Sequence, residues 1–61
     1  MYLIIDLTDG SAHTSKTMTD GMIDEFYEET IAIVDLDTNS EVIDISESGK
    51  VKLGPIKEWV D

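Results

Sequence analysis

Residues 31–46 read Ile-Ala-Ile-Val-Asp-Leu-Asp-Thr-Asn-Ser-Glu-Val-Ile-Asp-Ile-Ser, and this stretch decides the fold. Residues 31–37 and 41–46 are rich in β-branched side chains, which favours two strands. The polar residues between them, Thr38-Asn39-Ser40, are typical of a turn because such side chains bond to the nearby backbone. The stretch therefore predicts a β-hairpin.

A helix is predicted just before this hairpin, over residues 19–30. Thr19 or Asp20 can cap its amino end, and apolar side chains such as Met22 and Phe26 fall on one stripe at helical spacing. The other stripe is acidic and consists of Asp24, Glu25, Glu28 and Glu29. An amphipathic helix of this kind is expected to pack its apolar stripe on the sheet.

The first part of the chain predicts a second hairpin. Residues 2–8 are mostly apolar and β-branched, which favours a strand, and Asp9-Gly10 suits a tight turn because glycine tolerates positive φ. Residues 11–17 are polar but rich in threonine, so they form either a weak return strand or a loop.

The last part of the chain predicts one more strand. Ser48-Gly49 forms a turn into residues 51–53, and Gly54-Pro55 interrupts that strand because proline cannot donate to a ladder. Residues 56–60 are expected to close the core as a short strand or turn. The order ββαβββ indicates a single α+β domain over residues 1–61, a small antiparallel sheet with one helix packed across one face.

Length and composition bound the possible functions. A chain of 61 residues with 41% apolar content is expected to fold, yet its thin core leaves no room for a deep pocket. Cysteine is absent, so neither a disulfide framework nor a thiolate metal site is possible. The apolar run at residues 1–5 is too short for a signal peptide or a membrane span, and a cytoplasmic location is expected.

The charge is strongly negative. Fourteen acidic residues stand against four lysines and no arginine, which gives a formal net charge of −10. Such a surface repels nucleic acid and anionic lipid, whose phosphates require cations, and it attracts basic protein surfaces. We therefore expect a basic protein partner, with no nucleic acid and no membrane.

The acidic stripe of the predicted helix is the first candidate partner-binding site. Asp24 and Glu28 are spaced i,i+4, as are Glu25 and Glu29, and like charges at this spacing destabilise a helix by about a few tenths of a kcal/mol per pair. The stripe either keeps a solvated face soluble or presents negative charge to a basic partner.

A second acidic group is predicted on the sheet surface away from the helix. Side-chain alternation puts carboxylates on that face near one end of the sheet, and Asp44 shares the face of Val42. The row consists of Asp6, Asp35, Asp37 and Asp44, and the last three are the second candidate partner-binding group. Carboxylates about 7 Å apart along a strand match the scale of phosphate spacing in nucleic acid. Such a row would mimic DNA, although nearly any acidic sheet fulfils this condition.

Two apolar runs, residues 2–5 and 31–34, predict strands that need cover on both faces. The helix covers one face only, and we place Tyr2, Ile4, Ile31 and Ile33 on the other. Either the C-terminal segment around Trp59 covers these four side chains, or a second copy of the chain does. We favour a homodimer in which they form the self-association surface.

Motifs for chemistry are weak. The stretch Asp35-x-Asp37-x-Asn39-x-Glu41 resembles the first ligand positions of an EF-hand calcium loop, but Ser40 and Ser46 stand where the loop needs glycine and a bidentate glutamate. A hairpin turn with acidic ends explains it better. His13 is the single histidine and has no identifiable second metal ligand. We expect no catalytic residues, no metal and no cofactor.

In size, acidity and lack of chemistry the chain is similar to small phage-encoded inhibitors, such as anti-restriction, anti-CRISPR and uracil-DNA-glycosylase-inhibitor proteins. The similarity rests on these gross properties, and we assign no family. It implies a non-enzymatic binding protein, a phage-type inhibitor or nucleic-acid mimic that occupies a basic site on a partner. The alternative is a structural or accessory module that self-assembles, with its acidity serving solubility only.

Overall fold

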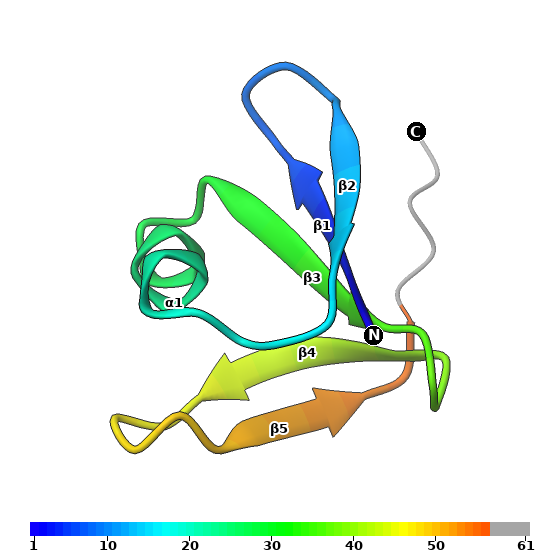
Figure 1. The fold of residues 1–61 in the computed structure, drawn as a ribbon, viewed down its shortest axis with the longest axis vertical. Helices are drawn as coiled ribbons and strands as arrows, with labels where there is room; N and C mark the ends of the chain where they lie inside the picture. Colours follow the sequence, from blue (N-terminus) through cyan, green and yellow to red (C-terminus); the bar gives the residue numbers. More distant parts are fainter. Residues whose placement is uncertain (57–61) are drawn as a thin grey trace.

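The computed structural model describes residues 1–56 as five strands and one helix. The elements are β1 (Tyr2–Asp6), β2 (Ala12–Ser15), α1 (Asp20–Tyr27), β3 (Ile31–Asp35), β4 (Ser40–Ile45) and β5 (Val51–Gly54). The strands form one antiparallel sheet in the order β2-β1-β3-β4-β5, with α1 across one face (Figure 1). This arrangement confirms the predicted α+β fold.

Residues 56–60 were predicted to close the core. From residue 57 onward, this segment lies outside the described part of the chain. Within residues 1–56, no helix has the length and apolar character needed to cross a membrane.

The hairpin of β3 and β4 forms as predicted, although β3 ends two residues earlier than expected and β4 begins and ends one residue earlier. The connecting turn covers residues 36–39, and the Asp35 carboxylate accepts a hydrogen bond from the Asp37 N–H at 2.9 Å. Asn39 takes the left-handed conformation, with φ of 52°, which asparagine tolerates better than most side chains. Asp35 is thus the last residue of β3, and its carboxylate stabilises the turn that begins at Leu36.

The segment between the first strand and the helix is a strand rather than a loop. Ala12–Ser15 pairs with β1 in antiparallel register, after a turn in which Gly10 has φ of 77°. Of the two alternatives, a weak return strand and a loop, the strand is therefore correct. Its sequence can be polar because β2 is an edge strand whose side chains are mostly exposed.

Helix α1 begins where the sequence predicts and ends earlier. The Thr19 side chain caps it by accepting a hydrogen bond from the Met22 N–H at 3.2 Å. Its last helical residue is Tyr27, because Glu29 takes a positive φ of 63° that a helix cannot continue. The predicted end at residue 30 was therefore too late.

The hydrophobic core lies between α1 and the sheet. It consists of Ile4, Met22, Ile31, Ile33, Val42 and Ile45, with Tyr2 and Phe26 among the partly buried side chains packed against it. Ile4 and Ile33 lie opposite one another in the β1–β3 register and are 2% and 0% exposed. The helix thus covers the face that carries these isoleucines.

The predicted position of Tyr2, Ile4, Ile31 and Ile33 on the face away from the helix was therefore wrong. Alternation shows which side chains share a face, but both faces of these strands are apolar, so it does not show which face the helix covers. Ile4, Ile31 and Ile33 are at most 5% exposed and cannot form a contact surface for a second chain, whereas Tyr2 is partly exposed. The oligomeric state itself stays a prediction.

A β-bulge in β4 sets which of its residues are buried. The register with β5 shifts between Val42 and Asp44, so Ile43 is the extra residue. Val42 and Ile45 are both buried, whereas Ile43 and Asp44 are exposed. The predicted placement of Asp44 on the face of Val42 was wrong because the bulge interrupts the alternation.

Matched isoleucine substitutions test this core. Ile33→Val removes a methylene from a fully buried side chain and should lower the free energy of unfolding by about 0.5–1.5 kcal/mol. Ile43→Val makes the same change in a side chain that is 43% exposed, and should change it by less than about 0.5 kcal/mol. Urea unfolding followed by circular dichroism measures both. Equal losses would contradict the assigned core.

Candidate functional site

The sheet is split between β3 and β4. These strands pair only at Val34–Glu41 and Asp35–Ser40. Continuing that register would bring Ala32 opposite Ile43, but no pairing occurs there. Figure 1 shows the two strands diverging from their turn, with α1 lying at the open end. The divergence leaves a seam in the sheet that no strand of the described residues fills.

A groove of about 390 Å³ occupies this seam. Its apolar walls include Leu7, Phe26, Tyr27 and Ile43, and its carboxylates are Glu29, Glu41 and Asp44. The rings of Phe26 and Tyr27 form an edge-to-face pair with centroids 6.1 Å apart. No histidine, lysine, serine or cysteine of the described residues lines the groove. It is therefore amphipathic, with aromatic walls and net negative charge.

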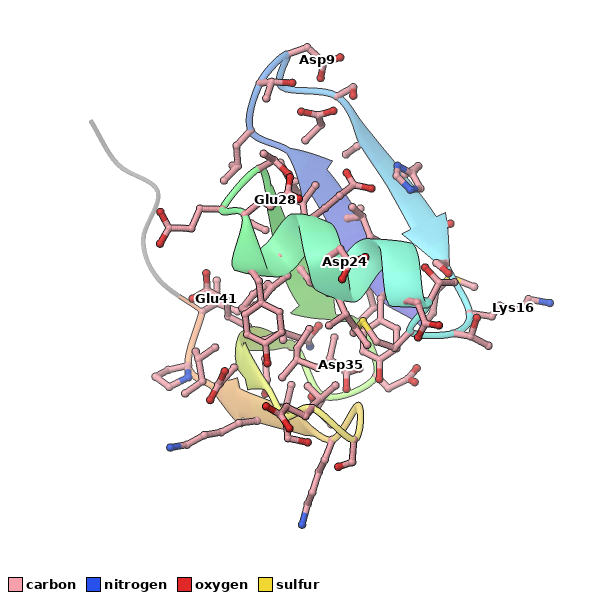
Figure 2. The ribbon with its side chains drawn as sticks, turned by 90° about the vertical axis from the view of Figure 1, so that its left-hand side faces the viewer. Asp9, Lys16, Asp24, Glu28, Asp35 and Glu41 are labelled. Carbon is pink, nitrogen blue, oxygen red and sulfur yellow. The ribbon has the colours of Figure 1, made fainter. Side chains whose placement is uncertain are left out.

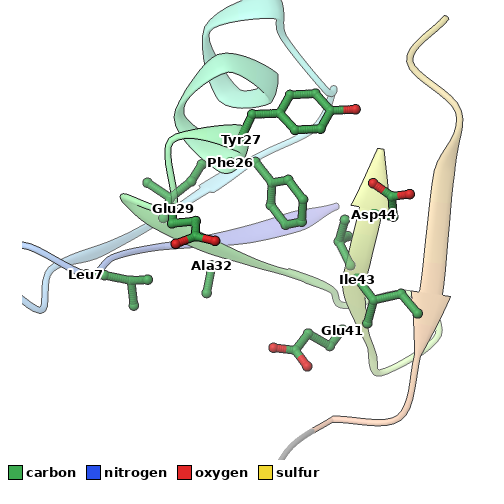
Figure 3. A pocket seen from close by; sticks show the side chains of 10 residues that line it. Leu7, Phe26, Tyr27, Glu29, Ala32, Glu41, Ile43 and Asp44 are labelled. Carbon is green, nitrogen blue, oxygen red and sulfur yellow. The ribbon is translucent and has the colours of Figure 1, made fainter. Parts of the chain in front are cut away.

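Glu41 is the unusual residue of this groove. Its side chain is only 7% exposed, and among the described residues its Oε2 atom is buried without a hydrogen-bond partner. Figure 3 shows its carboxylate pointing away from β4, toward the side where Leu7 and Ala32 lie. Burying an unpartnered polar group opposes folding, and more so for a charged one. The groove thus contains an acceptor with no donor from the described chain.

The other two carboxylates reach the groove from opposite sides. Glu29 follows the helix in a left-handed conformation that usually belongs to glycine. Asp44 lies in the irregular part of β4, and its Oδ1 accepts the Ile45 N–H at 2.9 Å. Lys52 pairs with Asp44 across the β4–β5 ladder, but the two side chains form no ion pair. The groove charge is therefore not neutralised from this side.

The structure separates the four predicted helix carboxylates into two places. All four are exposed, and Figure 2 shows Asp24 on the outer side of α1 and Glu28 at its carboxyl end. Glu29 lies beyond the helix and lines the groove instead. Helical periodicity was extended past the residue where the helix ends, so this grouping was partly wrong.

The predicted row of strand carboxylates does not form. Asp6 pairs with Ile31 and Asp35 pairs with Tyr2, so the two aspartates lie at opposite ends of the β1–β3 pair. Each aspartate is the last residue of its own strand, and two antiparallel strands have their last residues at opposite ends of the pair. Their face is also the one that α1 covers. A DNA-like row on the opposite face was therefore wrong.

The remaining turn carboxylate has a structural contact. Asp37 lies in the β3–β4 turn and forms an ion pair with the amino group of Met1 at 2.8 Å. Within residues 1–56, no three His, Asp or Glu side chains lie close enough together to hold a metal ion. The EF-hand-like spacing thus brings no ligand set together among the residues that the structure describes.

Sequence reasoning missed the groove, although it had singled out two of its three carboxylates, Glu29 and Asp44. Glu41 appeared only as an imperfect calcium ligand. The sequence signal for its burial is weak, because a glutamate at the start of an apolar strand is usually exposed. The groove depends on where two neighbouring strands stop pairing, and a single sequence does not show that.

No protein-family model matches the chain, and neither the curated proteins nor the solved structures contain a match to it. The groove and the charged surface are therefore the features that bear on the function of this chain.

The pKa of Asp6 provides a test of the β1–β2 turn. The Thr8 hydroxyl and then the Thr8 N–H, which donate to the Asp6 carboxylate, hold its pKa below the ordinary value. Thr8→Ala should raise this pKa toward the ordinary value, whereas Thr14→Ala should leave it unchanged. Because the folded-state pKa is depressed, the stabilisation is present above the unfolded-state pKa and is lost as pH falls through the folded value. NMR of the carboxyl carbons during an acid titration measures the pKa of Asp6. If this pKa is the same in Thr8→Ala as in the wild type, the contact with the Thr8 hydroxyl is refuted.

The burial of Glu41 provides a test by stability. Glu41→Leu removes the unpartnered oxygen and should raise the free energy of unfolding by about 1–3 kcal/mol. Glu47→Leu, at an exposed position outside the groove, is the matched control and should have little effect. Urea unfolding compares the two variants. A clear loss of stability in Glu41→Leu would show that the carboxylate already has a partner in the free protein.

Proposed function

We propose that this chain is a non-enzymatic binding protein that uses its acidic surface to occupy a basic site on a partner protein. The observation that carries the proposal is uncompensated charge. Residues 1–56 hold twelve acidic side chains, the fourteen of the whole chain less Glu58 and Asp61. Asp37 is the one with an ion pair, and the other eleven form none within the described residues.

Two surfaces support this proposal. The outer side of α1 presents Asp24, Glu25 and Glu28 to solvent, and the nearby groove adds the carboxylates of Glu29, Glu41 and Asp44. Lys16 projects away from the molecule at the margin of the helix face in Figure 2. Such an excess of one sign raises the association rate with an oppositely charged surface and fixes its orientation.

The groove suits a basic protein partner better than the substrate of an enzyme. The groove holds carboxylates and aromatic rings but no described nucleophile or histidine beside them, and acid–base chemistry by carboxylates needs groups whose pKa values are pushed apart. Without the strand row, mimicry of nucleic acid has no sheet surface to support it. The chain would compete with nucleic acid for a basic site through the helix face and the groove.

The alternative, a self-assembling module, has weaker support. The residues of its proposed surface belong to the core or pack against it, and the exposed large apolar side chains come from separate parts of the chain, among them Leu7, Leu36 and Ile56. An obligate interface needs a large apolar surface. Light scattering at two salt concentrations checks this alternative, which requires a dimer that tightens as salt is added.

Charge neutralisation on the helix tests the proposal. A triple variant, Asp24→Asn, Glu25→Gln and Glu28→Gln, should lose most of the basic proteins that the wild type recovers from lysate at low salt. A control variant removes the same charge away from the helix, at Asp9, Asp37 and Glu47, and should retain them. Recovery should fall as salt rises because exposed charges are screened. Failure to recover basic proteins, or equal loss in both variants, would contradict the proposal.

A further inference from the structure

We propose that the groove between β3 and β4 binds an arginine side chain of the basic partner. The guanidinium would lie against Glu41, and its plane and methylene groups would lie along Phe26 and Tyr27. This inference rests on the proposed function, since it names the residue type that the acidic surface would hold. It adds one specific contact in the groove to the attraction that the exposed helix carboxylates exert on the basic partner as a whole.

The buried oxygen of Glu41 is an acceptor for which no described residue provides a donor. Its Oε2 atom lies out of reach of solvent, and the described residues give it no hydrogen bond. A neutral donor would satisfy the hydrogen bond but would leave the negative charges of Glu29, Glu41 and Asp44 unopposed. Hydrogen bonds between ionised groups are shorter and about twice as strong as neutral ones. A cation therefore suits this groove better than a neutral group.

The cation is organic rather than a metal ion. The groove carboxylates do not come together as a metal-ligating group within the described residues. The groove volume of about 390 Å³ also exceeds by far the ~30 Å³ share of a single water molecule. A ligand that spans the space must therefore carry both a cation and apolar bulk.

Arginine meets both conditions better than lysine. Its guanidinium is planar and carries five donors, so it can bond to a carboxylate with two parallel hydrogen bonds and still reach a second acceptor. It also stacks on aromatic faces more often than an ammonium group does. The groove provides Phe26 and Tyr27 on one wall and carboxylates on either side. Tyr27 is 53% exposed, so its ring is accessible from outside.

The test is an NMR titration of the 61-residue chain with a capped peptide that has one arginine between glycines. Amide signals of residues 26–29 and 41–44 should shift as peptide is added. A citrulline peptide has the same shape without the charge, and should bind at least about tenfold more weakly because the charged hydrogen bond is lost. A lysine peptide should also bind more weakly than the arginine peptide.

Two adjacent glutamates give the matched variants. Glu29→Gln should weaken arginine binding, whereas Glu28→Gln makes the same change at an exposed residue outside the groove and should not. Glu41→Gln should weaken it most, by about tenfold or more. A well-dispersed amide spectrum of Glu41→Gln shows that the variant is folded. If it is not folded, the Glu28 and Glu29 pair still decides the question.

Each other outcome overturns the inference in a recognisable way. Equal weakening by Glu28→Gln and Glu29→Gln would place binding on the general acidic surface, and the proposed function would survive without the groove. No binding of the arginine peptide, with recovery of basic proteins intact, would refute the groove alone.

Discussion

Ile4 of β1 and Ile33 of β3 lie opposite one another at the centre of the sheet, and both side chains are almost fully buried beneath α1. The packing of the helix depends on this pair, because it fixes which face of the two central strands is the core. The pairing of β1 with β3 extends over the full length of both strands. In a chain this small, with so little apolar area to bury, the loss of one such contact is a large part of the total stability.

The candidate binding site depends on the incomplete pairing of β3 with β4. β3 pairs with β1 along its whole length, whereas β4 separates from β3 after Glu41 and continues with β5. The end of α1 lies over the opening, and its aromatic side chains line a groove that also contains a buried carboxylate. A residue that opposes folding in the free protein is what a binding site is expected to contain. The negative charge of the surface and the unpartnered oxygen in the groove thus favour the same kind of ligand, a cationic side chain.

Much of this fold is predictable from local sequence, and the site is not. The element order, the apolar stripe containing Met22 and the turn at Asn39 follow from periodicity and turn chemistry, which act over a few residues. The face of Ile33 was misplaced because both faces of its strand are apolar. The bulge at Ile43 and the positive φ of Glu29 interrupt the periodic patterns on which the predicted site depended. The burial of Glu41 depends on the divergence of two strands, which is a property of the packed sheet.

The divergence of β3 and β4 is the central structural claim, and backbone nuclear Overhauser effects test it most directly. Directly opposed residues in an antiparallel pair have Cα atoms about 4.5–5.5 Å apart, which brings their backbone protons into range. We predict strong cross-strand contacts between Val34 and Glu41 and none between Ala32 and Ile43. A ladder that continues through Ala32 and Ile43 would close the seam, remove the groove and contradict the site.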